Sequence, residues 1–283
     1  MSGADDARPT PSLAPMLSLA PMPSLAIIIP TLNAAMTLPA TLARLTARPP
    51  REVAEIVVVD GGSADDSVAV AREGGARVVF AARGRGTQLA AGIMATRAPW
   101  LLLLHADTVL APGWGEVVAR FIAAPEAAGR AGYFRFALAE TSAPARRLAR
   151  VVAWRARVLG LPYGDQGLLI SRAFLAQVGG MAAWPLMEDV DLARRIGRAR
   201  LVALDADAVT SAARYGRGFR RRSLRNLTCL GLYYLGVAPS RLAAFYARRG
   251  SNLAGRKTAV DMKPAVTDNF GDRRCVSQFT REA

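Results

Sequence analysis

Cysteine and histidine are scarce in this chain of 283 residues. It has two cysteines, Cys229 and Cys275, and one histidine, His105. Two cysteines without metal-ligand spacing argue against a disulfide scaffold and against a cysteine-based zinc site, and they fit a reducing compartment. We therefore expect a cytoplasmic protein.

Long apolar segments are also lacking. The longest candidate, residues 227–237, is too short to span a bilayer. The first 24 residues carry two aspartates and five prolines, whereas a signal peptide needs a positive start and an unbroken apolar run. We predict a disordered leader over residues 1–24 and no transmembrane helix.

Acidic residues are outnumbered, because 22 Asp and Glu stand against 37 Lys and Arg and leave a net charge of +15. Such an excess attracts a nucleotide diphosphate, a nucleic acid or an anionic membrane. The arginines lack the interleaved stacking aromatics of single-strand binders, so we expect no nucleic-acid partner. The Arg-rich segment 217–225 is where we expect peripheral contact with the inner face of a membrane, although a solvated basic face is the commoner meaning of such a run.

Apolar residues are plentiful, at 52% of the chain, and they fall into short runs that alternate with helical patterns. Residues 25–30, 54–59, 77–80 and 100–104 have the all-apolar texture of strands buried on both faces. This alternation predicts an α/β fold with a mainly parallel sheet flanked by helices. Further strands are expected at 133–138 and 167–171, and helices at 87–96, 146–159, 188–198 and, as a helical C-terminal part, 215–249.

We place one domain over residues 25–249 and a loose tail over 250–283, where the sequence turns polar and aperiodic. Ser63 followed by Asp66 indicates a capping box at the start of a helix.

Polar clusters follow three of the predicted strands. They are Pro30-Thr31-Leu32-Asn33, Asp60-Gly61-Gly62-Ser63 and His105-Ala106-Asp107. Because ligands of open α/β sheets bind outside the carboxyl ends of the strands, this coincidence is the first functional indication.

Two features suit a nucleotide. The Asp60 carboxylate can accept a hydrogen bond from a base, and the glycines after it let a ligand approach the backbone; the alternative is an aspartate that satisfies its own turn. Arg85 lies between glycines before a predicted helix, which suits a diphosphate. A solvated loop explains the same pattern.

Two acidic clusters suit catalysis. His105 and Asp107 are two residues apart on an extended segment and can share one divalent cation, while a core histidine is the alternative for His105. Glu188, Asp189 and Asp191 repel one another, which raises a carboxyl pKa toward that of a general base. The helix dipole alone also favours acids at that place.

In this combination and order, the motifs resemble those of family-2 glycosyltransferases, which have the GT-A fold. The resemblance covers about residues 25–210 and rests on Ile28–Asn33, Val57–Ser63, Arg85–Gly92, His105–Thr108 and Glu188–Leu192. Tyr163–Gly167 and Pro185–Asp189 are similar to a bacterial subgroup of arsenosugar-biosynthesis or radical-SAM/selenodomain-associated transferases.

The resemblance implies a role for each motif. The nucleotide site is formed by Pro30, Thr31, Asn33, Asp60 and Arg85, and Asp107, with His105, binds a Mn²⁺ or Mg²⁺ ion. Asp189, beside Glu188, is the base of an inverting hexosyl transfer from a UDP- or GDP-linked donor to an unidentified acceptor, and Asp165 and Gln166 shape the acceptor pocket. His105 stands where the family carries the first Asp of its metal motif, and imidazole suits Mn²⁺ better than Mg²⁺.

Two other functions remain open from the sequence. A nucleotidyltransferase acting on a small phosphorylated metabolite would keep Asp60 and Asp107 and would release pyrophosphate. A non-catalytic nucleotide-binding module held at a membrane by its Arg-rich segment would show no turnover.

Overall fold

The computed structural model describes residues 24–140, 142–210 and 219–254, with the backbone alone over 219–223 and 247–254. The predicted leader over residues 1–24 lies almost wholly outside this range. Most of the tail predicted from residue 250 also lies outside it, and so do most side chains of segment 217–225. The chain divides into two compact units, residues 1–243 and 244–283.

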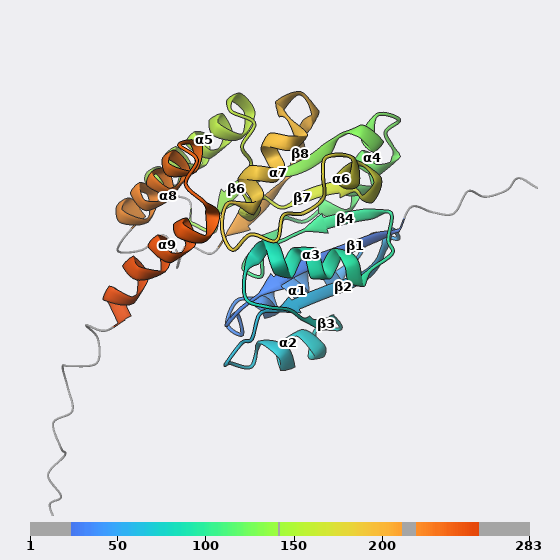
Figure 1. Ribbon diagram of the computed structural model, residues 1–283. Coiled ribbons are helices and arrows are strands. Elements are labelled where there is room, and N and C mark those ends of the chain that lie inside the picture. Colours follow the sequence, from blue (N-terminus) through green and yellow to red (C-terminus); the bar gives the residue numbers. More distant parts are fainter. Residues whose placement is uncertain (1–23, 141, 211–218, 255–283) are drawn as a thin grey trace, which may run out of the picture. The chain divides into compact units, whose positions relative to one another are not determined.

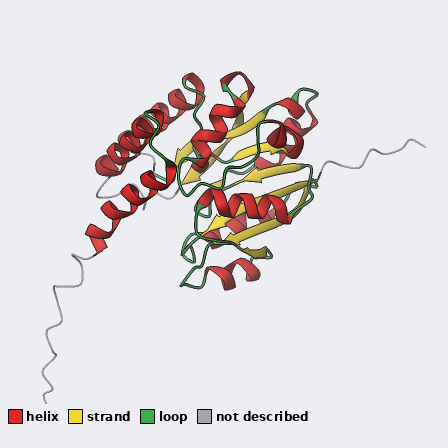
Figure 2. Ribbon diagram, viewed as in Figure 1, coloured by secondary structure: helices red, strands yellow, loops and turns green. Residues whose placement is uncertain are grey.

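The first unit is built on one sheet of eight strands in the order β3-β2-β1-β4-β7-β6-β8-β5 (Figures 1 and 2). β3, β2, β1 and β4 run parallel, whereas β7 is antiparallel to both of its neighbours and β5 is antiparallel to β8. The strands are β1 (Leu25–Thr31), β2 (Val53–Asp60), β3 (Arg77–Phe80), β4 (Trp100–Leu103), β5 (Thr108–Leu110), β6 (Ala131–Leu138), β7 (Leu168–Ser171) and β8 (Leu201–Thr210).

The helices between the strands cover both faces of the sheet. They are α1 (Leu38–Ala47), α2 (Ser67–Glu73), α3 (Arg85–Ala95), α4 (Trp114–Ala123), α5 (Ala143–Val158), α6 (Arg172–Gln177) and α7 (Glu188–Ile196). Helices α8 (Phe219–Tyr234) and α9 (Pro239–Ala254) follow β8 in the chain. No helix in the described part of the chain is both long and apolar enough to cross a membrane.

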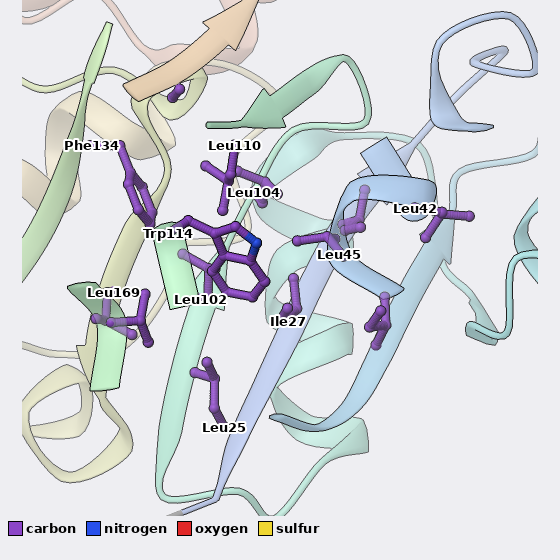
Figure 3. Packing of buried hydrophobic residues seen from close by; sticks show 14 of the residues in the cluster. Leu25, Ile27, Leu42, Leu45, Leu102, Leu104, Leu110, Trp114, Phe134 and Leu169 are labelled. Atoms are coloured by element: carbon purple, nitrogen blue, oxygen red, sulfur yellow. The ribbon is translucent and has the colours of Figure 1, made fainter. Parts of the chain in front are cut away.

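The all-apolar strands are explained by two cores, one on each face of the sheet. Leu25, Ile27 and Ile29 point into the core formed with α1 and α4 (Figure 3). Ala26 and Ile28 point into the opposite core, with side chains of α3, α6 and α7. Because successive strand residues point to opposite faces, a strand covered on both sides must be apolar at every position.

Helix α3 lies unusually close to the sheet because of a glycine. A Cβ atom at Gly92 would stand 2.4 Å from Cγ2 of Ile28 and 2.8 Å from Cγ2 of Val59. Only a residue without a side chain allows this approach, which brings the N-terminus of α3 to the carboxyl ends of β1 and β2.

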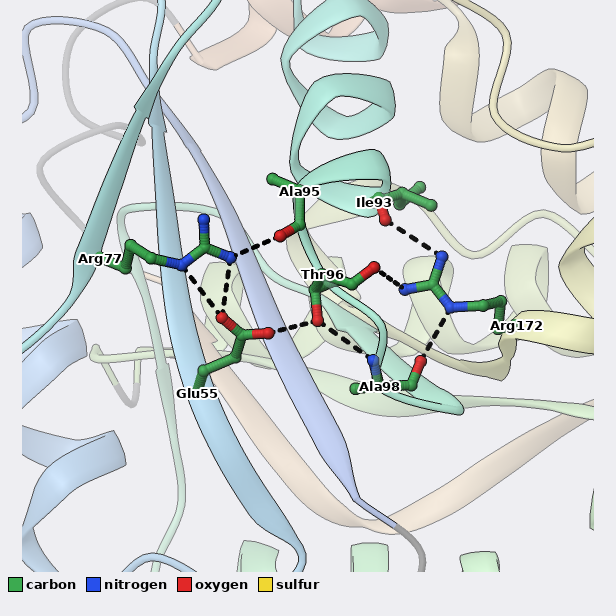
Figure 4. Close-up of polar contacts among 7 residues, drawn as sticks. All are labelled: Glu55, Arg77, Ile93, Ala95, Thr96, Ala98 and Arg172. Atoms are coloured by element: carbon green, nitrogen blue, oxygen red, sulfur yellow. Dashed lines mark hydrogen bonds and ion pairs between the residues drawn. The ribbon is translucent and has the colours of Figure 1, made fainter.

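Polar side chains fasten the other end of α3. Arg172 donates to the carbonyls of Ile93, Thr96 and Ala98 over 2.9–3.0 Å (Figure 4). Arg77 donates to the Ala95 carbonyl and to the Glu55 carboxylate. Cationic side chains at a helix C-terminus satisfy carbonyls that have no partner within the helix and complement the helix dipole.

The architecture confirms the α/β class, the mainly parallel first half of the sheet and the predicted strands and helices. The predicted capping box is wrong, because α2 begins at Ser67 and the Ser63 hydroxyl instead donates to the Asp60 carboxylate. Gly236, with φ of +84°, and Pro239 split the helix expected over 215–249 into α8 and α9, and α9 runs past residue 250. Strands β5 and β8 and helices α4 and α6 were not anticipated.

Candidate active site

The carboxyl ends of β1 and β2 form one wall of the candidate site. Asp60, only 2% exposed, accepts hydrogen bonds from the backbone N–H groups of Gly62 and Ser63 at 2.9 and 3.0 Å. The structure thus shows the aspartate satisfying its own turn, and base binding by Asp60 stays a prediction. The neighbouring Pro30 and Thr31 are buried in β1.

Asn33 connects the loops that follow these two strands. It has a φ of +49°, its side-chain oxygen accepts from the Ala64 N–H at 2.8 Å, and its own N–H donates to the Ser63 hydroxyl at 2.9 Å. A left-handed conformation is tolerated by asparagine better than by most residues. Asn33 therefore fastens the loop after β1 to the loop after β2.

Gln88, which the sequence analysis did not single out, holds the two strand ends together. The side chain is 3% exposed, and its Nε2 donates to the carbonyls of Thr31 and Val59, each at 2.7 Å. A glutamine in the first turn of a helix, just after a Gly-rich loop, was the only signal available in the sequence.

Arg85, at the N-terminus of α3, pairs with Glu188, at the N-terminus of α7. Nε of Arg85 lies 2.7 Å from Oε1 of Glu188, whose side chain is 1% exposed while that of Arg85 is 38% exposed. Burial raises the pKa of Glu188 to about 7. The Asp189 charge also raises this pKa, whereas the Arg85 charge lowers it. Glu188 therefore titrates near neutral pH.

The N–H groups at the start of α3 are partly in use. The Gly86 N–H donates to the Trp184 carbonyl at 3.0 Å, and a Cβ atom at Gly86 would lie 2.3 Å from the Ala182 carbonyl oxygen. The loop before α7 is thus pressed onto α3, and diphosphate binding here would depend on the Arg85 side chain more than on backbone N–H groups.

A small cavity brings the predicted catalytic residues together. Its lining includes His105, Tyr163, Gly164, Glu188 and Asp189, and the rest of the lining is apolar. The Gly164 N–H donates to Oδ2 of Asp189 at 2.9 Å, and the Asp189 carboxylate also accepts from the Val190 N–H at 2.8 Å. The carboxylate is therefore held in a fixed orientation at the edge of the cavity.

His105 packs against the same loop. A Cβ atom at Gly164 would lie 2.3 Å from Nε2 of His105, so a larger residue there would displace the imidazole. Asp107, 7% exposed, lies beyond it in the turn between β4 and β5, where the Thr108 N–H donates to the His105 carbonyl at 3.2 Å. Asp107 is not part of the cavity lining.

The loop that carries Asp165 and Gln166 is fixed from behind by α5. Arg155 stacks on the Tyr163 ring, 3.4 Å from its centroid, and donates to the Leu161 carbonyl and to Oε1 of Gln166. Gln166 is 1% exposed and donates to the Phe134 carbonyl. Its side chain supports the loop from inside, whereas Asp165 is half-buried; acceptor contact stays a prediction for both.

Tyr233 of helix α8 packs on α7 and on the loop before it, a contact that the sequence did not predict. The Tyr233 hydroxyl lies 3.4 Å from Oδ1 of Asp191, and its ring meets that of Trp184 edge-on, with 6.4 Å between the ring centroids. Asp191 also binds Arg195 at 2.7 Å, one turn along α7. Asp191 is therefore a structural acid, in contrast to its neighbours Glu188 and Asp189.

Comparison with models of protein families gives a match. The model described as Glycosyl transferase family 2 matches residues 26–168, about half of the chain. This chain belongs to glycosyl transferase family 2. The matched segment holds Asp60, Arg85, His105 and Asp107, and the family-2 assignment makes the protein a glycosyltransferase acting on nucleotide sugars.

Solved structures of similar fold include those of glucosyl-3-phosphoglycerate synthase from Mycobacterium tuberculosis. Its complex with Mn²⁺, uridine diphosphate and glucosyl-3-phosphoglycerate is 19% identical, with 66% of this chain and 70% of that chain covered and a TM-score of 0.48. Its complex with Mg²⁺ and uridine diphosphate is 20% identical, with 66% and 69% covered and a TM-score of 0.47. No curated protein sequence matches this chain significantly.

Proposed function

We propose that this family-2 enzyme transfers a hexosyl group from a UDP- or GDP-linked sugar to an acceptor hydroxyl with inversion, and that Asp189 is the general base. The observation that carries the proposal is the Asp189 carboxylate, which is oriented by the Gly164 N–H and faces the cavity shared with His105 and Glu188. A base must be within reach of the hydroxyl whose proton it takes, and a fixed carboxylate at a cavity wall meets that requirement.

The reaction follows from this placement. Asp189 takes the proton of the acceptor hydroxyl while the hydroxyl oxygen forms a bond to the anomeric carbon. The bond between that carbon and the diphosphate oxygen breaks on the opposite face, so the configuration inverts and a nucleoside diphosphate leaves. The donor lies along the carboxyl ends of β1 and β2, against Pro30, Thr31, Asn33 and Asp60.

Arg85 and Glu188 prepare the donor end of the site. The 2.7 Å ion pair holds the guanidinium at the N-terminus of α3, where a guanidinium and a diphosphate form charge-assisted hydrogen bonds. Glu188 is thus a positioning residue for Arg85, and the charge of the pair adjusts when the donor binds.

A divalent cation fits these residues only if the protein and the donor diphosphate coordinate it together. In the part of the chain that the structure describes, no three His, Cys, Asp or Glu side chains gather around one point. His105 and Asp107 offer one imidazole and one carboxylate from a tight turn, and diphosphate oxygens would complete the coordination of Mn²⁺ or Mg²⁺. The ion would supply charge neutralisation of the leaving diphosphate.

The acceptor side remains with the loop from Tyr163 to Gln166. Asp165 and Gln166 are the residues we expect to shape the acceptor pocket, Asp165 by contact and Gln166 by supporting the loop. Membership of the arsenosugar-biosynthesis or selenodomain-associated subgroup, a cytoplasmic location and membrane contact through segment 217–225 belong to the same proposal.

The first experiment is a thermal-shift titration with UDP, GDP and their sugar conjugates, with and without Mn²⁺. A ligand that binds only the folded state raises the melting temperature. We expect a metal-dependent shift that is lost in Asp107→Ala and kept in Asp205→Asn, a matched control whose carboxylate is 82% exposed on β8.

Product analysis separates the remaining alternatives. Release of nucleoside diphosphate with transferred sugar supports the proposal, whereas release of pyrophosphate indicates a nucleotidyltransferase. If no nucleotide raises the melting temperature, with or without Mn²⁺, the donor site is degenerate and the transferase proposal is wrong.

A further inference from the structure

Helix α5 has two apolar faces, and packing within the described chain accounts for only one. Its inner face buries Ala145, Val152 and Ala156. Its outer face exposes Val151 by 61%, Trp154 by 56% and Val158 by 48%. At spacings of three and four residues these three side chains form a continuous stripe on the solvent side of the helix.

The outer stripe has a strongly positive border. Residues 141–164 contain five arginines and no acidic residue. Arg147 and Arg150 join Val151 and Trp154 around a shallow depression. Within the residues that the structure describes, no ion pair engages Arg147, Arg150 or Arg157, so no described acid neutralises these charges by direct pairing.

We propose that the outer face of α5 docks onto an anionic lipid membrane. A tryptophan and aliphatic side chains enter the boundary between headgroups and acyl chains, while arginines beside them reach lipid phosphates. Each basic residue near an anionic surface adds to the attraction, and α5 carries no acid to oppose it.

Other occupants fit this face less well. Residues 208–260 contain eleven basic residues and no acid, so the C-terminal part of the chain does not complement α5 in charge. A second copy packed symmetrically would oppose arginine to arginine. A nucleic acid would meet one exposed aromatic, Trp154, where single-strand binders present several in succession.

This docking mode has a consequence for the active site. Arg155, on the inner side of the same helix, stacks on Tyr163 and binds the loop that lines the cavity. A bilayer on the outer face would thus lie about one helix diameter, roughly 10 Å, from that loop. The docking itself does not depend on the proposed transfer reaction.

The test is co-sedimentation of the full chain with vesicles of phosphatidylcholine alone or of equal parts phosphatidylcholine and phosphatidylglycerol. We expect binding to the anionic vesicles only, weakened by salt. Trp154→Ala should lower the partition coefficient about tenfold, because the ring no longer enters the interface. The control Met94→Ala, which removes an apolar side chain 86% exposed on α3, should leave binding unchanged.

A charge-matched pair of variants distinguishes this face from net charge. Arg147→Ala/Arg150→Ala should weaken binding about 20-fold. Arg51→Ala/Arg97→Ala removes the same charge from exposed positions elsewhere and should change it little. Equal losses in the two double variants, unchanged binding of Trp154→Ala, equal binding to neutral vesicles, or binding to single-stranded RNA in place of vesicles would each overturn the proposal.

Discussion

Each end of helix α3 lies beside an ion pair between a glutamate and an arginine, yet the two pairs differ in kind. At the C-terminal end, Glu55 binds Arg77 at 2.8 Å and also accepts from the Thr96 hydroxyl. At the N-terminal end, Glu188 binds Arg85 at 2.7 Å beside a cavity and a second carboxylate, Asp189.

The two glutamates also differ in protonation. Burial acts to raise the pKa of Glu55, but the hydrogen bonds from Thr96 and Arg77 outweigh it and leave the pKa below its ordinary value. Burial raises the pKa of Glu188 to about 7, because Arg85 compensates only in part and Asp189 adds repulsion. In the first pair the carboxylate is fully compensated, and the pair fastens the fold. In the second pair the burial of the carboxylate is compensated only in part, and the carboxylate borders a cavity, as perturbed groups at functional sites often do.

The largest effect is expected at the functional end. Asp189→Asn should lower kcat about a thousandfold, because general-base catalysis contributes roughly 10²–10⁴ and the amide cannot take the proton. Its melting temperature should stay near that of the parent enzyme, and Glu55→Gln should keep full activity. Rates of sugar transfer with both variants check this, and an active Asp189→Asn enzyme would remove Asp189 from the base role.

The next effect concerns the pH dependence of stability. Between pH 4.5 and about 7, folded Glu188 keeps its proton and unfolded Glu188 loses it, so stability falls as pH rises through this window. A shift of this size corresponds to about 3 kcal/mol in the free energy of unfolding. Denaturant unfolding from pH 4.5 to 8 should show this decline in the parent and not in Glu188→Gln.

The control for that measurement is Asp205→Asn, whose carboxylate is 82% exposed. It should keep the slope of the parent protein. If Glu188→Gln keeps the slope as well, another group causes it and the contrast between the two ends of α3 loses its electrostatic basis.

The strands beside α3 could be predicted from the sequence, whereas the ion pair at its N-terminus could not. The strands that frame the helix were predictable because burial on both faces demands apolar residues at every position, as in Leu25–Ile29. Glu188 and Asp189 stood out because acids seldom cluster without a reason. The pairing of Glu188 with Arg85 joins residues 103 apart in sequence, and no local pattern encodes such a contact.

The second half of the sheet was harder to predict for a related reason. In β8, Leu204, Ala206 and Ala208 are buried while Asp205 is exposed, so the strand has one covered face and a weak alternating signal. Small alanines dilute that signal, and β5 has only three residues. Gln88 was missed because a buried amide is recognised by its partners, which lie in β1 and β2.

A smaller effect is expected at the structural end. Arg172→Ala removes three charge-assisted hydrogen bonds to the carbonyls of Ile93, Thr96 and Ala98 (Figure 4). The expected loss is about 2 kcal/mol of unfolding free energy, without change in KM for the donor. Arg97→Ala, which removes an exposed arginine nearby, should lower the free energy of unfolding by only a few tenths of a kcal/mol. Denaturant unfolding measures both losses. A changed KM in Arg172→Ala would mean that the two ends of α3 are coupled.

The smallest effect is expected for Glu55→Gln, which keeps the shape of the side chain and removes its charge. The pKa of Glu55 is lower in the folded state than its unfolded value of 4.5. Glu55 therefore stabilises the protein when the pH is above 4.5, and this contribution is lost as the pH falls through the folded-state pKa. We expect a loss of roughly 1 kcal/mol at pH 7, measured by urea unfolding, since the pair is partly solvent-screened, and a smaller loss as the pH falls below 4.5. This slope is opposite in sign to that of Glu188. If both glutamates gave slopes of the same sign, the two pairs would have the same electrostatic character, and the structural and functional ends of α3 could not be told apart by titration.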